Sequence, residues 1–286
     1  DVIQQIAGRC NRVINTLHPI VDARLEDGSR VHVVLEPVAL NGPILTIRKF
    51  PDPITMDRLL KYGSVTREAA DLLKTLAAAR YNIFVSGGTG AGKTTFLNAL
   101  SEFIPPEERV ITIEDSAELK LAHIENLVRL ETRNANGEGQ GAIGIGMLIR
   151  AALRMRPDRI VIGEVRGQEA VDLLQAMNTG HDGSFCTGHA NSCRDMLARL
   201  ETMVLMGMEL PLPAIRSQIA SALDVMVHVA RMRDRSRKVT AIEEVVGIEN
   251  GEIVLRPLFS LDGEGELRKA GDLRCQEKLR RAGYGL

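Results

Sequence analysis

The spacing of apolar residues near the start of the chain first predicts a helix and then three short strands. Apolar side chains recur at helical intervals between Ile3 and Leu17, which predicts a helix that ends before Pro19. Short apolar segments separated by Asp-Gly and Asn-Gly turn pairs then predict three strands. These strands are expected near residues 20–25, 30–36 and 44–49. We expect a small α+β N-terminal domain over residues 1–50.

The pattern changes again after a proline-rich linker, predicted over residues 51–64. Short apolar runs alternate with amphipathic helical segments, which is typical of an α/β domain with a parallel sheet. The expected strands lie at 81–85, 109–113, 127–131 and 160–162, followed by antiparallel strands at 225–231, 239–248 and 252–255. The expected helices lie at 55–61, 66–80, from 94 onward, and at 147–155, 167–178, 192–206, 213–223 and 272–282. We assign residues 65–286 to this second domain.

Composition narrows the class of protein. The chain has 286 residues, 44% of them hydrophobic and 26% charged, which is ordinary for a globular protein. A formal net charge of −1, together with three Tyr, six Phe and no Trp, argues against a nucleic-acid partner. Four widely spaced cysteines are expected to be reduced thiols in a cytosolic protein. Because the first residue is Asp1, we expect a fragment of a longer chain, with a truncated N-terminal domain.

A glycine-rich segment joins the strand predicted over residues 81–85 to a predicted helix. Its glycines allow successive backbone N–H groups to point toward one phosphate, at φ values that a Cβ would resist. Lys93 is expected to reach the β- and γ-phosphates, and the Thr94 hydroxyl to hold Mg²⁺. The expected nucleotide-binding residues are Gly87, Gly88, Thr89, Gly90, Ala91, Gly92, Lys93, Thr94 and Thr95. Strand, loop and helix together predict a nucleoside triphosphate site rather than an ordinary glycine turn.

Acidic residues follow two other predicted strands, at the edge where open α/β sheets bind ligands. Glu114 and Asp115 are candidates for binding Mg²⁺ or for orienting the attacking water, with a solvated acidic loop as the alternative. Glu164 is the only carboxylate at the tip of its strand, because Gly163 stands where an Asp is common. We expect Glu164 to polarise the attacking water; the alternative is a glutamate that only caps a strand.

Two histidines lie in a segment of small residues that follows the strand of Glu164. His181 and His189 in this position suggest a sensor of the γ-phosphate, although a lone histidine is more often structural. Cys186, His189 and Cys193 could suggest zinc, but a fourth ligand and paired-cysteine spacing are missing. His189 is therefore the candidate catalytic histidine.

Six motifs follow one another along the chain: GGTGAGKTT, VITIEDSAEL, VRLETR, ALRMRPDRIVIGEVRG, MNTGHDGSFCTGHANS and RLETMV. Their order closely resembles the ATPases of the type II/type IV secretion superfamily, and within it most resembles the Tad/Flp pilus-assembly ATPases (CpaF-type). Gly188 departs from the resemblance, because the family more often has a bulky apolar residue there. The resemblance names a Walker A motif at 87–94, an Asp box at 111–118, a Walker B motif at 160–164 and a His box at 181–189.

The resemblance also implies an assembly. It implies a RecA-like P-loop ATPase domain preceded by a small α+β domain, in a homo-hexamer that hydrolyses ATP with Mg²⁺ at subunit interfaces. It implies inner-membrane platform proteins of a pilus or secretion machine as partners, with the motor at the cytoplasmic face of that membrane. Arg30 and Arg48 lie in segments that resemble the family's arginine-bearing strands, where they would complete a neighbour's active site. Arg133 is a weaker third candidate, and the alternative is that such arginines only decorate strand ends.

Two other functions share this kind of domain. A RecA-like nucleic-acid translocase would need base-stacking aromatic residues, of which the chain has few. A small-molecule P-loop phosphotransferase would need an acceptor pocket and a mobile arginine-bearing lid, and no segment after residue 164 has that form. We therefore favour a motor ATPase that drives pilus assembly or protein secretion.

Overall fold

The computed structural model describes residues 2–10, 12–49, 52–133, 135 and 140–284. The chain divides into two compact units, Asp1–Asp52 and Pro53–Leu286, and each is described by itself. No helix among the described residues has the length and apolarity needed to cross a membrane.

The first unit packs one helix on a three-stranded antiparallel sheet of order β1-β2-β3. Its elements are α1 (Val2–Arg9), β1 (Ile20–Arg24), β2 (Arg30–Val34) and β3 (Ile44–Arg48). The helix is shorter than its apolar spacing predicted. The side chain of Asn15 accepts hydrogen bonds from the backbone N–H groups of Leu17 and His18, which turns the chain away from a helix. Val13 and Leu17 consequently lie exposed.

The second unit begins with two helices, α2 (Met56–Lys61) and α3 (Arg67–Ala78). The Thr55 side chain accepts a hydrogen bond from the N–H of Arg58 and so caps α2. Met56 and Leu59 are buried in the core of this unit. Part of the segment expected as a linker, 51–64, is thus a packed helix.

A nine-stranded sheet forms the centre of the second unit, in the order β12-β11-β10-β9-β4-β8-β7-β5-β6. The strands from β9 to β6 in this order are parallel, and β10, β11 and β12 extend the sheet in antiparallel fashion. The parallel strands are β4 (Ile83–Gly87), β5 (Arg109–Glu114), β6 (Asn126–Glu131), β7 (Arg159–Val165), β8 (Phe185–His189) and β9 (Val225–Arg231). The others are β10 (Arg237–Glu249), β11 (Glu252–Leu261) and β12 (Leu267–Lys269).

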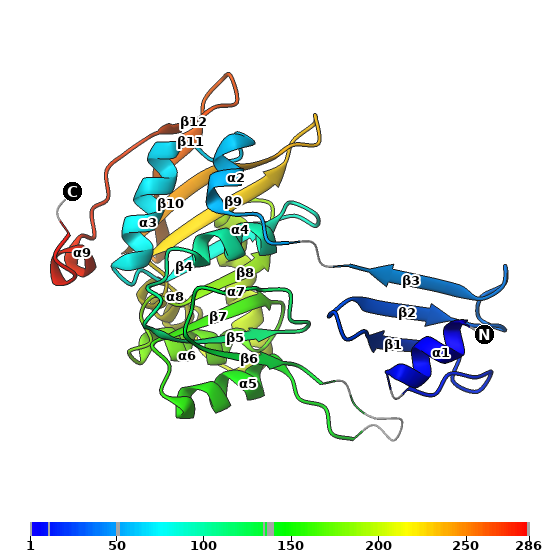
Figure 1. Ribbon diagram of the computed structural model, residues 1–286. Helices are drawn as coiled ribbons and strands as arrows, with labels where there is room; N and C mark the ends of the chain where they lie inside the picture. The colour runs from blue at the N-terminus through cyan, green and yellow to red at the C-terminus, as the bar shows by residue number, and fades with distance from the viewer. Residues whose placement is uncertain (1, 11, 50–51, 134, 136–139, 285–286) are drawn as a thin grey trace. The chain divides into compact units, whose positions relative to one another are not determined.

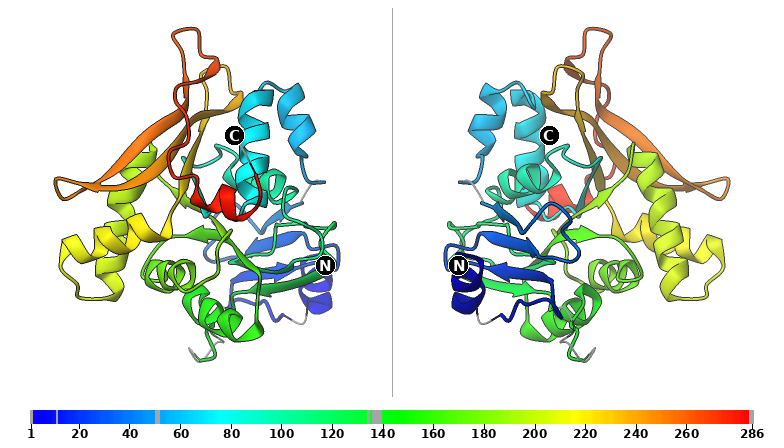
Figure 2. Two further views of the ribbon diagram at one scale, coloured as in Figure 1. Left: turned by 90° about the vertical axis from the view of Figure 1, so that its left-hand side faces the viewer. Right: turned by 90° about the vertical axis from the view of Figure 1, so that its right-hand side faces the viewer.

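Helices cover both faces of this sheet, as Figures 1 and 2 show. On one face lie α2, α3 and α4 (Lys93–Ser101); on the other lie α5 (Ile145–Ala152), α6 (Ala170–Asn178), α7 (Cys193–Gly207) and α8 (Leu212–Ala222). Ile83 and Val85 of β4 pack on the first face and Phe84 on the second, all fully buried. A continuous apolar run is therefore a strand here because both its faces are covered.

The C-terminal tail is less helical than predicted. Only α9 (Glu277–Arg281) forms within the expected helix at 272–282. The buried carboxylate of Glu244 on β10 accepts hydrogen bonds from the N–H groups of Arg274 and Cys275. Because these N–H groups bond to a side chain, the segment before α9 runs along the sheet instead of coiling.

Candidate nucleotide-binding and catalytic site

The phosphate loop connects β4 to α4 at the carboxyl edge of the parallel strands. Gly90 and Gly92 have φ values of +71° and +93°, a region that side chains with a Cβ rarely adopt. Gly87 serves a different need, because a Cβ there would lie 2.4 Å from the carbonyl oxygen of Val229 on β9. The loop can therefore direct its N–H groups to one anion, at the N-terminal end of α4.

Lys93 opens α4 and is only 8% exposed. Its Nζ donates to the carbonyl oxygen of Gly88 at 3.2 Å and lies 3.1 Å from Nδ1 of His189. Burial lowers the pKa of Lys93, and the nearby carboxylate of Glu164 partly opposes that shift. Thr94 and Thr95 are half-buried in the first turn of the helix. Among the described residues the ammonium group contacts no carboxylate, which suits it to a phosphate.

Glu164 and His189 come together because they end adjacent parallel strands, β7 and β8. Oε1 of Glu164 lies 2.7 Å from Nε2 of His189, and it is buried and accepts no hydrogen bond among the described residues. The other carboxylate oxygen accepts two hydrogen bonds from Arg166. Burial lowers the pKa of His189, which keeps the imidazole neutral at pH 7. A water molecule donating to Oε1 would satisfy this buried acceptor.

Glu114 ends β5 and is buried, 2% exposed. Its Oε1 accepts hydrogen bonds from the N–H groups of Glu118 and Leu119, which holds the loop after β5. Burial raises the pKa of Glu114 to about 7. A Cβ at Gly163 would lie 2.9 Å from the Cγ of Glu114. The missing Walker B aspartate therefore has a physical reason: the side chain of Glu114 occupies its space.

Asp115, the other acid predicted to bind metal, is directed toward the same cluster. Its Oδ2 lies 3.1 Å from Nη1 of Arg166, so one arginine links Asp115 with Glu164. Among the described residues, no group of three or more His, Cys, Asp or Glu could hold a metal ion. The donors present, hydroxyl and carboxylate oxygens, do suit Mg²⁺, which keeps several waters and binds proteins through one or two such groups plus phosphate oxygens. Thr94, Glu114 and Asp115 remain the predicted ligands.

The predicted arginines lie elsewhere in the chain. Arg30 and Arg48 are direct cross-strand partners on β2 and β3 of the first unit, so their side chains leave the same face of that sheet. Arg133 follows β6, and its Nε donates to the carbonyl oxygen of Gly141 at 2.8 Å. Part of the loop after Arg133, residues 134 and 136–139, lies outside the described residues.

Sequence reasoning missed two arginines at this site. Arg166 lies two residues after Glu164, and that proximity was a usable signal. Arg237, the first residue of β10, donates from Nε to the carbonyl oxygen of Gly90 at 2.9 Å. Nothing in the motif pointed to Arg237, which lies 147 residues from that glycine along the chain.

The structure also explains the departure at Gly188. A Cβ at this position would lie 2.8 Å from Sδ of Met196 and 3.0 Å from Cε1 of Phe84. These two side chains fill the space that a bulky residue would take, so the strand that carries His189 is packed normally. Cys186 and Cys193 nearby are buried thiols whose pKa values burial raises.

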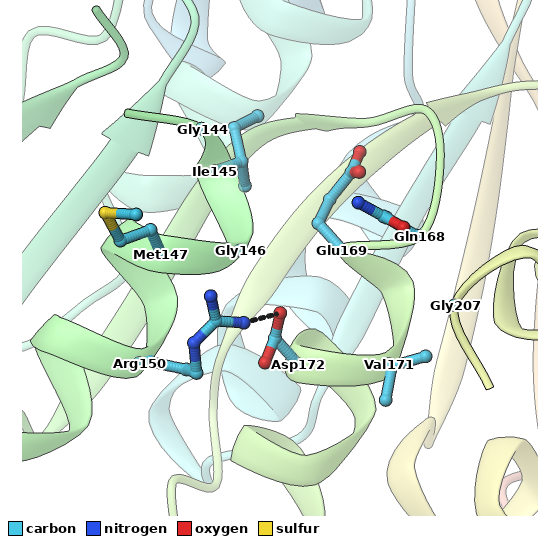
Figure 3. Close-up of a pocket in the computed structure, with 10 residues that line it drawn as sticks. All are labelled: Gly144, Ile145, Gly146, Met147, Arg150, Gln168, Glu169, Val171, Asp172 and Gly207. Atoms are coloured by element: carbon cyan, nitrogen blue, oxygen red, sulfur yellow. Dashed lines mark hydrogen bonds and ion pairs between the residues drawn. The ribbon is translucent and has the colours of Figure 1, made fainter. Parts of the chain in front are cut away.

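One hollow of about 450 Å³ lies between the start of α5, the start of α6 and the end of α7. It adjoins the Glu164 cluster through Glu169, which accepts a hydrogen bond from the N–H of Arg166. Figure 3 shows Arg150 and Asp172 pointing toward one another in it, joined by an ion pair of 2.7 Å. None of its lining residues belongs to the phosphate loop or to the Glu164 cluster. The chemistry therefore centres on the sheet edge and not on this hollow.

Comparison with known proteins finds similar sequences over most of the chain. A family model described as "Type II/IV secretion system protein" matches residues 2–258. A Mycobacterium tuberculosis protein described as a putative conjugal transfer protein is 43% identical over 247 residues, which cover 84% of this chain and 69% of that protein.

Two solved structures are similar as well. The VirB11 ATPase of the Brucella suis type IV secretion system, solved with sulphate, is 31% identical, with a TM-score of 0.56 over 85% of this chain and 79% of that one. The Legionella pneumophila ATPase DotB, 20% identical, has a TM-score of 0.58 over 88% of this chain and 69% of that one. The predicted fold, a RecA-like P-loop ATPase domain after a small α+β domain, is confirmed.

Proposed function

The chain belongs to the type II/IV secretion system protein family, and from that membership we propose that it is a Mg-ATP-driven motor for pilus assembly or protein secretion. It is an ATPase, as the similar VirB11 protein of Brucella suis is. The observation that carries the proposal for the site is the buried, unsatisfied Oε1 of Glu164 beside Lys93 and His189. An acceptor in that place suits the task of polarising a water molecule.

Each residue of the site has a separate role in binding or hydrolysing ATP. The N–H groups of loop 87–94 hold the phosphates, and Lys93 binds the β- and γ-phosphate oxygens. Glu164 accepts a proton of the attacking water through Oε1, while Arg166 holds its other oxygen in place. Neutral His189, in contact with both Lys93 and Glu164, reports whether the γ-phosphate is present. Bound Mg²⁺, held by Thr94 with water and the acids Glu114 and Asp115, would neutralise developing charge on the phosphates.

A further cation for the γ-phosphate is proposed to come from the N-terminal unit, because Arg166 is already bound to Glu164 and Asp115. Arg30 and Arg48 stand side by side on one sheet face, so both guanidinium groups can approach the same phosphate oxygens. We assign them to the site of a neighbouring subunit in a ring of six, with Arg133 as a further candidate. An arginine supplied late in this way contributes roughly 10³- to 10⁵-fold to phosphoryl transfer.

Within the superfamily the motifs favour the Tad/Flp pilus-assembly branch. We place the motor at the cytoplasmic face of the inner membrane, bound to platform proteins of a pilus or secretion machine. A pull-down of the platform protein with this chain, and its loss when the ring is dissociated, would test that placement. Retention of the chain on naked DNA with DNA-stimulated turnover would favour a translocase instead.

A mixing experiment tests the shared active site. Subunits carrying Glu164→Gln are combined with subunits carrying Arg48→Ala, each nearly inactive alone. Mixed rings regain ATPase activity where the intact Glu164 of one subunit meets the intact Arg48 of its neighbour. Mixing Glu164→Gln with Lys93→Ala is the matched control, because both residues act in the same subunit and no interface is restored. Absence of recovery with Arg48→Ala, in rings shown to be mixed, contradicts the assignment in trans.

A further inference from the structure

The hairpin between β9 and β10 brings two arginines to the carboxyl edge of the sheet. Arg231 is the last residue of β9 and Arg237 the first of β10. The turn between them is ordered: Oδ1 of Asp234 accepts hydrogen bonds from the N–H and hydroxyl of Ser236, and the N–H of Met232 bonds to the carbonyl oxygen of Ser236. The two arginines are therefore held at a fixed separation.

Arg231 and Arg237 are direct cross-strand partners, so their side chains leave the same face of the sheet. That face is the one that carries α4, because Val229, two residues before Arg231, packs in the same core as Phe96. Both arginines are exposed, and among the described residues neither has a carboxylate partner within ion-pair distance. Like charges directly opposite each other destabilise a sheet, so this pair suits an anion that bridges it.

Arg237 already contacts the phosphate loop. Its Nε donates to the carbonyl oxygen of Gly90 at 2.9 Å, and its Cδ lies 3.2 Å from where a Cβ of Gly92 would be. The guanidinium thus lies against the loop, and its Nη1 and Nη2 have no partner among the described residues. A fork with two open donors beside a phosphate site suits a second phosphate oxygen or a ribose hydroxyl.

The order of the strands fixes which end of a nucleotide lies there. Glu164 and His189 end β7 and β8, on one side of the phosphate-loop strand β4, whereas β9 and β10 lie on its other side. With the bond to be hydrolysed facing Glu164, the α-phosphate and ribose would extend toward β9 and β10. We propose that Arg237, with Arg231 beside it, binds the α-phosphate–ribose end of the nucleotide in the same subunit. This rests on the proposed nucleotide site.

Binding measurements on the full chain test the assignment, with ADP and inorganic phosphate as probes. Arg237→Gln should weaken ADP binding about tenfold while leaving phosphate binding nearly unchanged, since a single phosphate in the loop has no α-phosphate–ribose end. Arg231→Gln should weaken ADP binding less. Arg235→Gln, an exposed arginine in the turn of the same hairpin, is the matched control and should change neither affinity.

Each outcome has a distinct meaning. Equal loss of ADP and phosphate affinity in Arg237→Gln would show that Arg237 only supports the loop through Gly90, and unchanged ADP affinity would show that it does not touch the ligand. Either result overturns the proposal. Lys93→Ala tests the underlying site: if it leaves phosphate binding intact, the phosphate loop itself is not the anion site, and that failure is separate from the role of Arg237.

Discussion

The two sides of the phosphate loop differ in whether their charged side chains have partners. On the β7–β8 side, polar and charged side chains contact one another: Lys93 contacts the neutral His189, His189 contacts Glu164, and Arg166 joins Glu164 to Asp115. On the β9–β10 side, Arg231 and Arg237 face each other without a carboxylate among the described residues. The first side is a preset network and the second is a pair of cations that an anion would complete.

This difference implies that the residues on one side of the loop serve ATP hydrolysis and those on the other side serve nucleotide binding. A paired network holds its groups in place before the substrate arrives, which is what stabilising a transition state requires. Unpaired cations gain most when a ligand arrives, which favours binding of substrate and product alike. Changes on the β7–β8 side should therefore alter turnover, and changes on the β9–β10 side should alter nucleotide affinity.

The largest effect expected on the β7–β8 side is that of Glu164→Gln. The amide keeps the shape and the contact with Arg166 but cannot accept the proton, so kcat should fall roughly 10²- to 10⁴-fold. The affinity for ADP, measured by calorimetry, should stay within a factor of about two. Turnover near that of the unchanged chain would show that Glu164 does not activate water.

His189→Ala should have a smaller effect of the same kind. Removing the imidazole that contacts Lys93 and Glu164 should slow turnover about tenfold. ADP affinity should be nearly unchanged, because ADP lacks the phosphate that His189 is proposed to sense. Equal losses of ADP and ATP affinity would make His189 structural and would remove the contrast between the two sides.

The smallest effect concerns a neutral group on the β9 side. His228 is buried, its Nδ1 lies 2.9 Å from Oγ of Ser86, and burial lowers its pKa from 6.5. The folded chain then binds fewer protons at His228 than the unfolded chain, so stability rises with pH through the window below 6.5. His228→Gln should flatten this slope, by at most about 1.4 kcal/mol per pH unit.

Urea unfolding of the chain between pH 5 and pH 8 would measure that slope. His123→Gln, a change at an exposed histidine, is the control and should leave the pH dependence as it was. An unchanged slope in His228→Gln would mean that other groups set the acid sensitivity.

The part of the site that the sequence predicted is the part encoded locally. The phosphate loop, Glu164 and His189 each sit at the end of a parallel strand, and parallel strands bring their carboxyl ends to one edge. Motif order and strand pattern were therefore enough to place them together. The helix at 3–17 was overestimated because the apolar spacing does not show that Asn15 bonds to the backbone after it.

Other features depended on contacts that spacing cannot show. Arg237 reaches Gly90 only because β9 pairs with both β4 and β10, and because the turn sets their register. The reason for Gly163 was likewise hidden, since it depends on the side chain of a residue on β5. Both contacts depend on how strands distant in sequence pair with one another, and no local sequence pattern shows that pairing.

The close approach of Gly163 to Glu114 has a consequence for how such sequences can diverge. The two positions share one volume between neighbouring strands β5 and β7, and the space admits one long acidic side chain. An acid gained at 163 would have to be accompanied by a smaller or differently placed side chain at 114. The two positions should therefore be inherited together, as a single unit spread over two strands.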